Sequence, residues 1–97
     1  MPRYLLTPAA DGDIDGIWRY VWEHAPNAAD ELVAKAYRAF DLLTDNPGMG
    51  KVRTELRGEP RSFPMTGSPY VVFYRPSSDG VLILRVIHAS RDLDTIY

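Results

Sequence analysis

The most constraining feature of the sequence is residues 81–87, a run of six branched or apolar side chains with one arginine, Arg85. A turn signal of serine, aspartate and glycine leads into it at residues 78–80. This pattern predicts a strand covered on both faces, which belongs inside a sheet. His88, Arg91 and Asp92 follow directly. These three residues form a dense polar cluster set directly on a core element, the strand of residues 81–87.

Composition narrows the class of protein. The 97 residues fit one domain, 1–97, and 45% of them are apolar and 25% charged, as in globular proteins. No cysteine is present, which excludes a disulfide framework and thiolate ligands. No apolar run approaches the ~18 residues of a membrane span, and the N-terminus lacks the apolar region of a signal peptide. We expect a cytoplasmic protein that does not enter a membrane.

Charge is spread unevenly along the chain. The net charge is −2, with four basic and eight acidic residues in positions 1–46 and seven basic and five acidic residues in positions 47–97. A basic second half suits an anionic partner, and scattered solvated charge is the alternative. The overall acidity argues against a protein that coats nucleic acid, so we expect no direct nucleic-acid binding.

The first half of the sequence predicts a strand followed by two helices. Residues 3–7 are a short apolar strand, and Thr7 is the N-cap of a helix that ends at about His24. Asn27 is the expected N-cap of a second helix, which ends at about Asp45. Apolar side chains recur every three or four residues in both segments, as in amphipathic helices. Because the join between the two helices is short, they are expected to form an antiparallel hairpin.

The second half predicts a connecting loop over residues 48–60 and then three strands. The strands are residues 61–66, 70–75 and 81–87, with a proline in the first of them that suggests an edge position or a bulge. Short turns between them predict an antiparallel meander. The fold class is therefore α+β, in the order β-α-α-β-β-β, with the helical hairpin packed on an antiparallel sheet.

The two histidines offer little for a metal site. His24 and His88 are far apart and no spacing typical of zinc ligands is present, so we expect no metal and no cofactor. His88, Arg91 and Asp92 have the side chains needed for phosphodiester chemistry, as acid or base, phosphate holder and orienting group. The alternative is that they pair with each other or with the backbone and end the strand.

Arg85 lies within the apolar run and needs a partner. Strand alternation predicts that it shares a face of the sheet with Ile83 and Ile87. A charge on that face must be paired or close to solvent. Either it meets a carboxylate such as Glu55 or Glu59, or that face is an open groove.

Four motifs resemble the ParE branch of the RelE/ParE toxin superfamily, in their order and spacing over the whole chain. They are Tyr4-Leu5-Leu6-Thr7 with Ala10, Asp13-Ile14, Ile17-Trp18 and Tyr20, then residues 46–50, 72–75 and 83–88. The resemblance implies the toxin of a bacterial type II toxin–antitoxin pair. A ParD-like antitoxin would hold it inactive in a hetero-oligomeric complex, and the free toxin would poison DNA gyrase as a protein-binding inhibitor.

The sister RelE branch, which cuts mRNA on the ribosome, is the alternative implied by the same resemblance. Three of its basic positions correspond here to Ser62, Pro64 and Val71, which cannot hold a phosphate. Only Arg91 matches a basic RelE-type position. We therefore predict a protein that is not an enzyme. If it were a nuclease, the candidate catalytic residues would be His88, Arg91 and Arg85, with Arg61 as a further cation.

Binding residues can be nominated in two groups. Arg53, Arg57 and Arg61 are expected to meet acidic residues of the antitoxin. The remaining candidates for contact with the antitoxin or the target are Arg85, His88, Arg91 and Asp92. A helical hairpin beside a sheet also offers a groove for an added helix and an edge for an added strand.

A third possibility for the function, beside gyrase inhibition and mRNA cleavage, is an inactive toxin kept as a binding partner.

Overall fold

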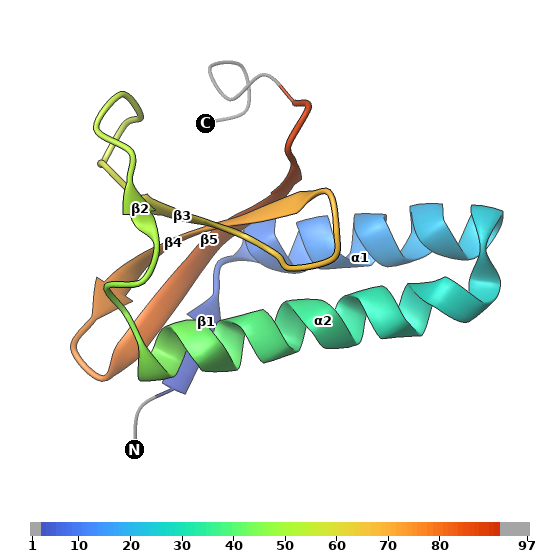
Figure 1. Cartoon of the computed structure of the whole chain (residues 1–97), viewed down its shortest axis with the longest axis horizontal. Helices are drawn as coiled ribbons and strands as arrows, with labels where there is room; N and C mark the ends of the chain where they lie inside the picture. The colour runs from blue at the N-terminus through green and yellow to red at the C-terminus, as the bar shows by residue number, and fades with distance from the viewer. Residues whose placement is uncertain (1–2, 92–97) are drawn as a thin grey trace.

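Two antiparallel helices lie against one face of a five-stranded sheet in the computed structural model, which describes residues 3–91 (Figure 1). The elements are β1 (Arg3–Leu6), α1 (Pro8–His24), α2 (Pro26–Asp45), β2 (Lys51–Val52), β3 (Arg61–Pro64), β4 (Tyr70–Ser77) and β5 (Gly80–His88). The predicted α+β class and the predicted order of the main elements are confirmed.

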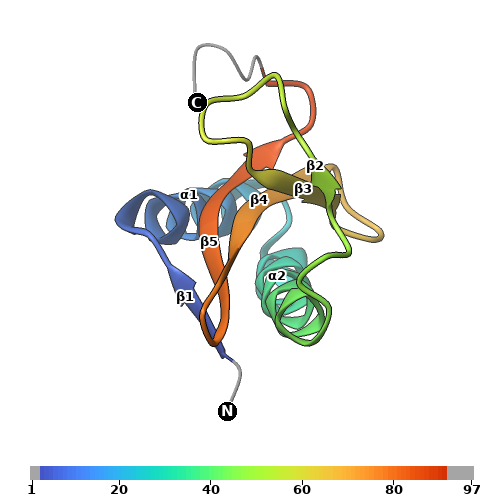
Figure 2. The same cartoon turned by 90° about the vertical axis from the view of Figure 1, so that its left-hand side faces the viewer.

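The strand order in the sheet is β1-β5-β4-β3-β2 (Figure 2). Strands β3, β4 and β5 form the predicted antiparallel meander, and β2 joins it antiparallel to β3. Strand β1 instead pairs parallel to β5, so the sheet is mixed rather than purely antiparallel. After the helical hairpin the chain enters β2 in the direction opposite to β1, and each later strand reverses direction, so β5 runs with β1. Strand β5 thus lies between two neighbours, as its apolar run predicted.

The prediction of a connecting loop over residues 48–60 was wrong at one point. Lys51 and Val52 pair with Ser62 and Arg61 and form the short strand β2 at the edge of the sheet. Both residues of β2 are exposed. A strand of two exposed residues has no apolar alternation, so sequence patterning gives no signal for it.

The ends of the helices follow local capping chemistry. Thr7 caps α1 as predicted, and its hydroxyl accepts the Ala10 N–H at 3.1 Å. The prediction of Asn27 as the cap of α2 was wrong, because α2 begins at Pro26 with Ala25 as its N-cap. Proline is pre-organised for the first turn of a helix, so the helix starts two residues earlier than predicted. Only Ala25 separates the two helices.

The core has two parts, one on each face of the sheet. The larger part lies between the helices and the sheet and includes the fully buried Phe40, Tyr74 and Ile83. The smaller part lies on the opposite face, where Leu56 of the loop before β3 covers Phe73 and Ile87. A chain of this length thus covers the middle of the sheet on both sides.

A β-bulge in β5 changes which side chains share a face. Phe73 of β4 is paired with Arg85, whereas Tyr74 is paired with Ile83, so Leu84 has no partner in the register. Ile83 accordingly belongs to the helix-side core and Ile87 to the opposite cluster. The prediction that Arg85 shares a face with both isoleucines was wrong, because one extra residue reverses the alternation.

Candidate functional site

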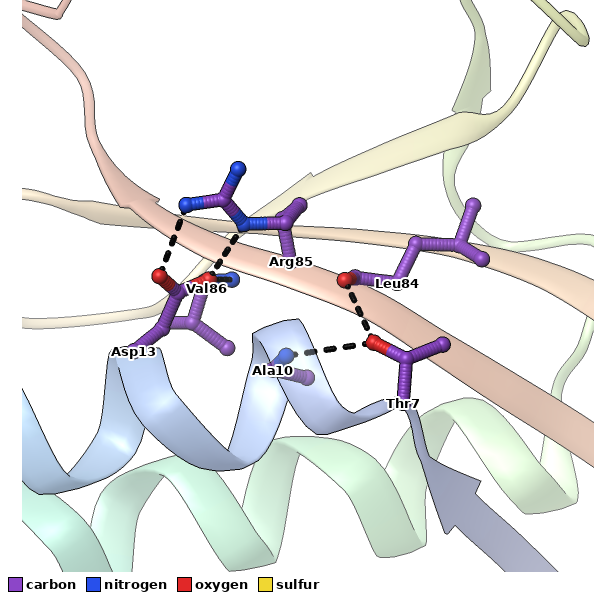
Figure 3. Close-up of polar contacts among 6 residues, drawn as sticks. All are labelled: Thr7, Ala10, Asp13, Leu84, Arg85 and Val86. Atoms are coloured by element: carbon purple, nitrogen blue, oxygen red, sulfur yellow. Dashed lines mark hydrogen bonds and ion pairs between the residues drawn. The ribbon is translucent and has the colours of Figure 1, made fainter. Parts of the chain in front are cut away.

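The start of α1 completes the edge of β5 where β1 ends (Figure 3). Strand β1 pairs with β5 only as far as Ile83. On that side of β5, the backbone of the next residues has no neighbouring strand. The Thr7 hydroxyl donates to the Leu84 carbonyl at 2.9 Å, and the Val86 N–H donates to Asp13 Oδ2 at 2.9 Å. Two side chains therefore take the place of a strand at this edge.

Asp13 also binds Arg85 through two parallel hydrogen bonds. Arg85 Nε donates to Oδ2 at 2.7 Å and Nη2 donates to Oδ1 at 2.8 Å, with the two side chains 27% and 15% exposed (Figure 3). Charge-assisted bidentate pairs of this kind are strong and directional. The expectation that Arg85 meets a carboxylate is therefore confirmed, but this carboxylate is Asp13 and not the suggested Glu55 or Glu59.

A groove of about 630 Å³ opens beside this ion pair. One wall is α1, and the other walls are Leu32 of α2, the residues Pro69 and Tyr70 where β4 begins, and the end of β5. The lining is mostly apolar and aromatic, and it includes Ile17 and Tyr20. Such a concave apolar surface with a few polar groups is typical of a binding site.

Two glycines keep the α1 wall of the groove low. Gly12 and Gly16 are one helical turn apart and both line the groove. A Cβ added at either position would meet nothing within 4 Å. The groove therefore owes part of its volume to missing side chains rather than to a bend in the helix.

His88 lies in the groove and is held by its neighbours. Its ring packs edge-on against Tyr70 with 5.4 Å between ring centroids. Its Nδ1 accepts the Ser90 N–H at 3.1 Å and lies 2.8 Å from the Ser90 hydroxyl, which suits a neutral ring with its proton on Nε2. Burial, and then the nearby Tyr20, raise the pKa of Tyr70, so this tyrosine stays a neutral hydrogen-bonding group.

The groove combines apolar walls with net positive charge. Two arginines, Arg85 and Arg91, line it together with His88, and among the described residues the one carboxylate of the lining is Asp13. Three of the nominated residues are thus brought together. The fourth nominated residue of that group, Asp92, lies outside the described residues. An acidic side chain on an apolar segment would match this surface.

The other nominated arginines lie at the β2–β3 end of the sheet and are not part of the groove. Arg53 pairs with Glu55 at 2.9 Å and lies over the Phe73 ring, 5.9 Å from its centroid. The Arg53 hydrogen bond helps to hold the pKa of the Glu55 carboxyl below its usual value. Arg61 donates from Nη1 to the carbonyls of Gly50 at 2.7 Å and Gly48 at 3.2 Å. Arg53 and Arg61 therefore stabilise the fold.

The glycine motif of residues 46–50 belongs to this same end of the molecule. The buried Tyr74 hydroxyl donates to the Pro47 carbonyl at 2.8 Å and accepts the Gly50 N–H at 2.7 Å. A Cβ on Gly50 would come within 2.7 Å of the Tyr74 ring, so only glycine fits. Burial raises the pKa of Tyr74 above its ordinary value. The motif is explained by packing rather than by ligand binding.

Within residues 3–91, no three metal-ligating side chains gather closely enough to hold an ion. The same part of the chain contains no helix long and apolar enough to cross a membrane.

Comparison with known proteins agrees with the sequence motifs. The family model for the "ParE toxin of type II toxin-antitoxin system, parDE" matches residues 4–93. Toxin ParE1 of Caulobacter vibrioides is 36% identical over 95 residues, which cover 93% of this chain and 92% of that toxin. Toxin RelE2 of the same organism is 30% identical over 91 residues, which cover 94% of this chain and 99% of that toxin.

A solved structure shows the same fold. A chain from the chromosomal ParDE TA system of P. aeruginosa matches with a TM-score of 0.76 and 23% identity, over 91% of this chain and 96% of that one. The predicted RelE/ParE-like architecture is thereby confirmed. From the family match, the similar sequences and the shared fold together, the chain belongs to the ParE family of type II toxin–antitoxin toxins.

Proposed function

We propose that this protein inhibits DNA gyrase and is neutralised by a ParD-like antitoxin. The observation that carries the antitoxin half of the proposal is the groove beside α1, with its apolar walls and its excess of positive charge. The membership of the chain in the ParE family supports the other half of the proposal, that the protein is a toxin that inhibits gyrase. A gyrase target places the active toxin in the cytoplasm.

The groove suits a segment of the antitoxin that has both apolar and acidic side chains. Apolar side chains would pack against Ile17, Leu32 and Tyr70, and a carboxylate would approach Arg91 at the rim. Disordered segments that fold on binding commonly use such a mixture, because apolar burial supplies affinity and charge fixes the register.

The side chains on β3 and β4 favour inhibition by binding over RNA cleavage. Ser62 is buried and accepts a hydrogen bond from Arg53, Pro64 is exposed, and Val71 is half-buried. None of these positions supplies a cation to a scissile phosphate, although phosphoryl chemistry depends on such charge. The side chains of Arg85 and His88 are already engaged by Asp13 and Ser90.

Two assays on the purified chain test the proposal. We expect loss of gyrase-dependent supercoiling and accumulation of cleaved DNA, while ribosome-bound mRNA stays intact. Adding the antitoxin encoded beside the toxin should restore supercoiling. Normal supercoiling together with cleaved mRNA would refute the gyrase proposal.

The RelE-type alternative keeps one specific support, the similarity to toxin RelE2. It predicts that mRNA cleavage depends on His88 and Arg91. If cleavage occurs and the variants His88→Ala and Arg91→Ala cut as fast as the unaltered chain, this site is not its active site. If expression without antitoxin leaves growth unaffected, the chain is an inactive member that only binds a partner.

A further inference from the structure

Trp18 and Trp22 form an exposed aromatic pair on α1, and neither residue lines the groove. Trp18 is 38% exposed and Trp22 is 50% exposed. Their rings are stacked, with 6.0 Å between centroids and 22° between planes. Single exposed apolar side chains are ordinary, but two adjoining indoles form a patch of the kind that marks an interaction site.

The pair is held in position before any partner arrives. Trp18 Nε1–H donates to Asp30 Oδ1 of α2 at 2.9 Å, which fixes the first ring across the hairpin. Trp22 then stacks on that ring. Figure 1 shows that the closed end of the hairpin, next to Trp22 in the sequence, projects beyond the sheet. An ordered aromatic surface on a projecting element loses little entropy on binding.

Carboxylates lie along the same face of α1 as the two indoles, and one more meets Trp18 from α2. Asp11, Asp15, Trp18 and Trp22 are spaced as i, i+4, i+7 and i+11, so they form one stripe about 16 Å long on α1. Asp11 and Asp15 are exposed, and within residues 3–91 neither forms an ion pair. Asp30 adds a third carboxylate from α2. We call these five residues the tryptophan stripe.

We propose that the tryptophan stripe docks a basic segment of a protein partner. An arginine or lysine side chain would lie over the open face of Trp22 and pair with the adjacent carboxylates. Tryptophan is the best aromatic surface for a cation, and the negative charge raises the local concentration of a basic segment. The same charge repels nucleic acid and anionic lipid, so the complementary partner is a protein.

This partner differs from the antitoxin segment proposed for the groove, because the groove is basic and the stripe is acidic. Resting on the proposed function, we assign the stripe to contact with the toxin's target. The toxin would thus use opposite charge on two flanks of α1 to distinguish its two partners.

A direct binding assay tests the stripe without reference to toxicity. The probe is a fluorescein-labelled hexa-arginine peptide, titrated with the full chain and followed by anisotropy. We expect Trp22→Ala and Asp15→Asn each to weaken binding about threefold or more, with Trp22→Phe intermediate. Asp45→Asn makes the same charge change at the far end of α2 and should bind as the unaltered chain does. Any binding of a labelled hexa-glutamate peptide should be unchanged by Trp22→Ala, because the stripe is acidic and the groove is basic.

Tryptophan fluorescence gives a second readout, because Trp18 and Trp22 are the two tryptophans of the sequence. Bound hexa-arginine should change the emission of the unaltered chain, and added salt should reverse the change. Circular dichroism and thermal melts would verify that each variant is folded. Equal affinity of the unaltered chain, Trp22→Ala and Asp15→Asn for hexa-arginine would overturn the proposal.

Cellular assays then test the assignment to the target. Trp22→Ala and Asp15→Asn should lose growth arrest while they still bind the antitoxin. Variants that arrest growth fully, or that lose antitoxin binding instead, would overturn the assignment. If the unaltered chain leaves gyrase unaffected, the proposed function fails, whereas the peptide assay still decides whether the stripe binds a basic segment.

Discussion

Asp13 is the residue on which the site depends most. Its carboxylate accepts hydrogen bonds from the Val86 N–H and from Nε and Nη2 of Arg85, and among the described residues it is the one carboxylate that lines the groove. It therefore joins α1 to the edge of β5 and sets the position of the arginine. Asp13 therefore stabilises the fold and also lines the groove in which a partner would bind.

Replacing Asp13 should be costly for this reason. We expect Asp13→Ala to lower the free energy of unfolding by about 2 kcal/mol, because it removes the carboxylate that binds a partly buried arginine and a backbone N–H. Urea denaturation measures the change. The control is Asp15→Ala, an exposed position on the same helix, which should change stability by less than about 0.5 kcal/mol. Equal effects of the two changes would show that the ion pair contributes nothing to folding.

Helix α1 serves two surfaces, and its glycines shape one of them. Gly16 faces open space in the groove, and its backbone is helical. Gly16→Ala should raise stability by about 0.5–1 kcal/mol, since glycine is a poor helix former. Gly16→Leu should also fold, yet its side chain would project into the groove and weaken antitoxin binding. Titration calorimetry with the antitoxin separates the two effects.

The matched control for Gly16→Leu is Glu23→Leu, which adds the same side chain on an exposed part of α1 outside the groove. This variant should bind the antitoxin normally. If Gly16→Leu also binds normally, the antitoxin does not use the groove, and the docking proposal is wrong.

The helices could be predicted from sequence because their signals are local. Thr7 and Pro8 define the start of α1, and the apolar period defines the faces of both helices. The partner of Arg85 could not be predicted, because Asp13 is 72 positions away and its role depends on where β1 ends. The bulge at Leu84 likewise arises from pairing with β4, which leaves no mark on the local pattern of β5.

At the scale of the whole molecule, all the basic residues of the second half except Arg75 fall into two groups. One group lies at the groove, and the other lies at the β2–β3 end of the sheet. The longest dimension of the protein is 37 Å, so an extended antitoxin segment of about 11 residues would reach from one group to the other. The expectation that Arg53, Arg57 and Arg61 meet the antitoxin thus stays a prediction, and the structure sharpens its test.

Arg57 is the best of these three for that test, because it is exposed, whereas Arg53 and Arg61 bind Glu55 and the carbonyl of Gly50. Arg57→Glu should weaken antitoxin binding about three- to tenfold at low salt, with a smaller effect at high salt and an unchanged melting temperature. Arg61→Glu should lower the melting temperature as well, since it removes internal hydrogen bonds. Arg38→Glu on α2 makes the same charge change elsewhere and should leave affinity near that of the unaltered chain. If Arg57→Glu and Arg38→Glu bind equally well, the antitoxin does not reach the β2–β3 end, and the groove alone accounts for its electrostatic attraction.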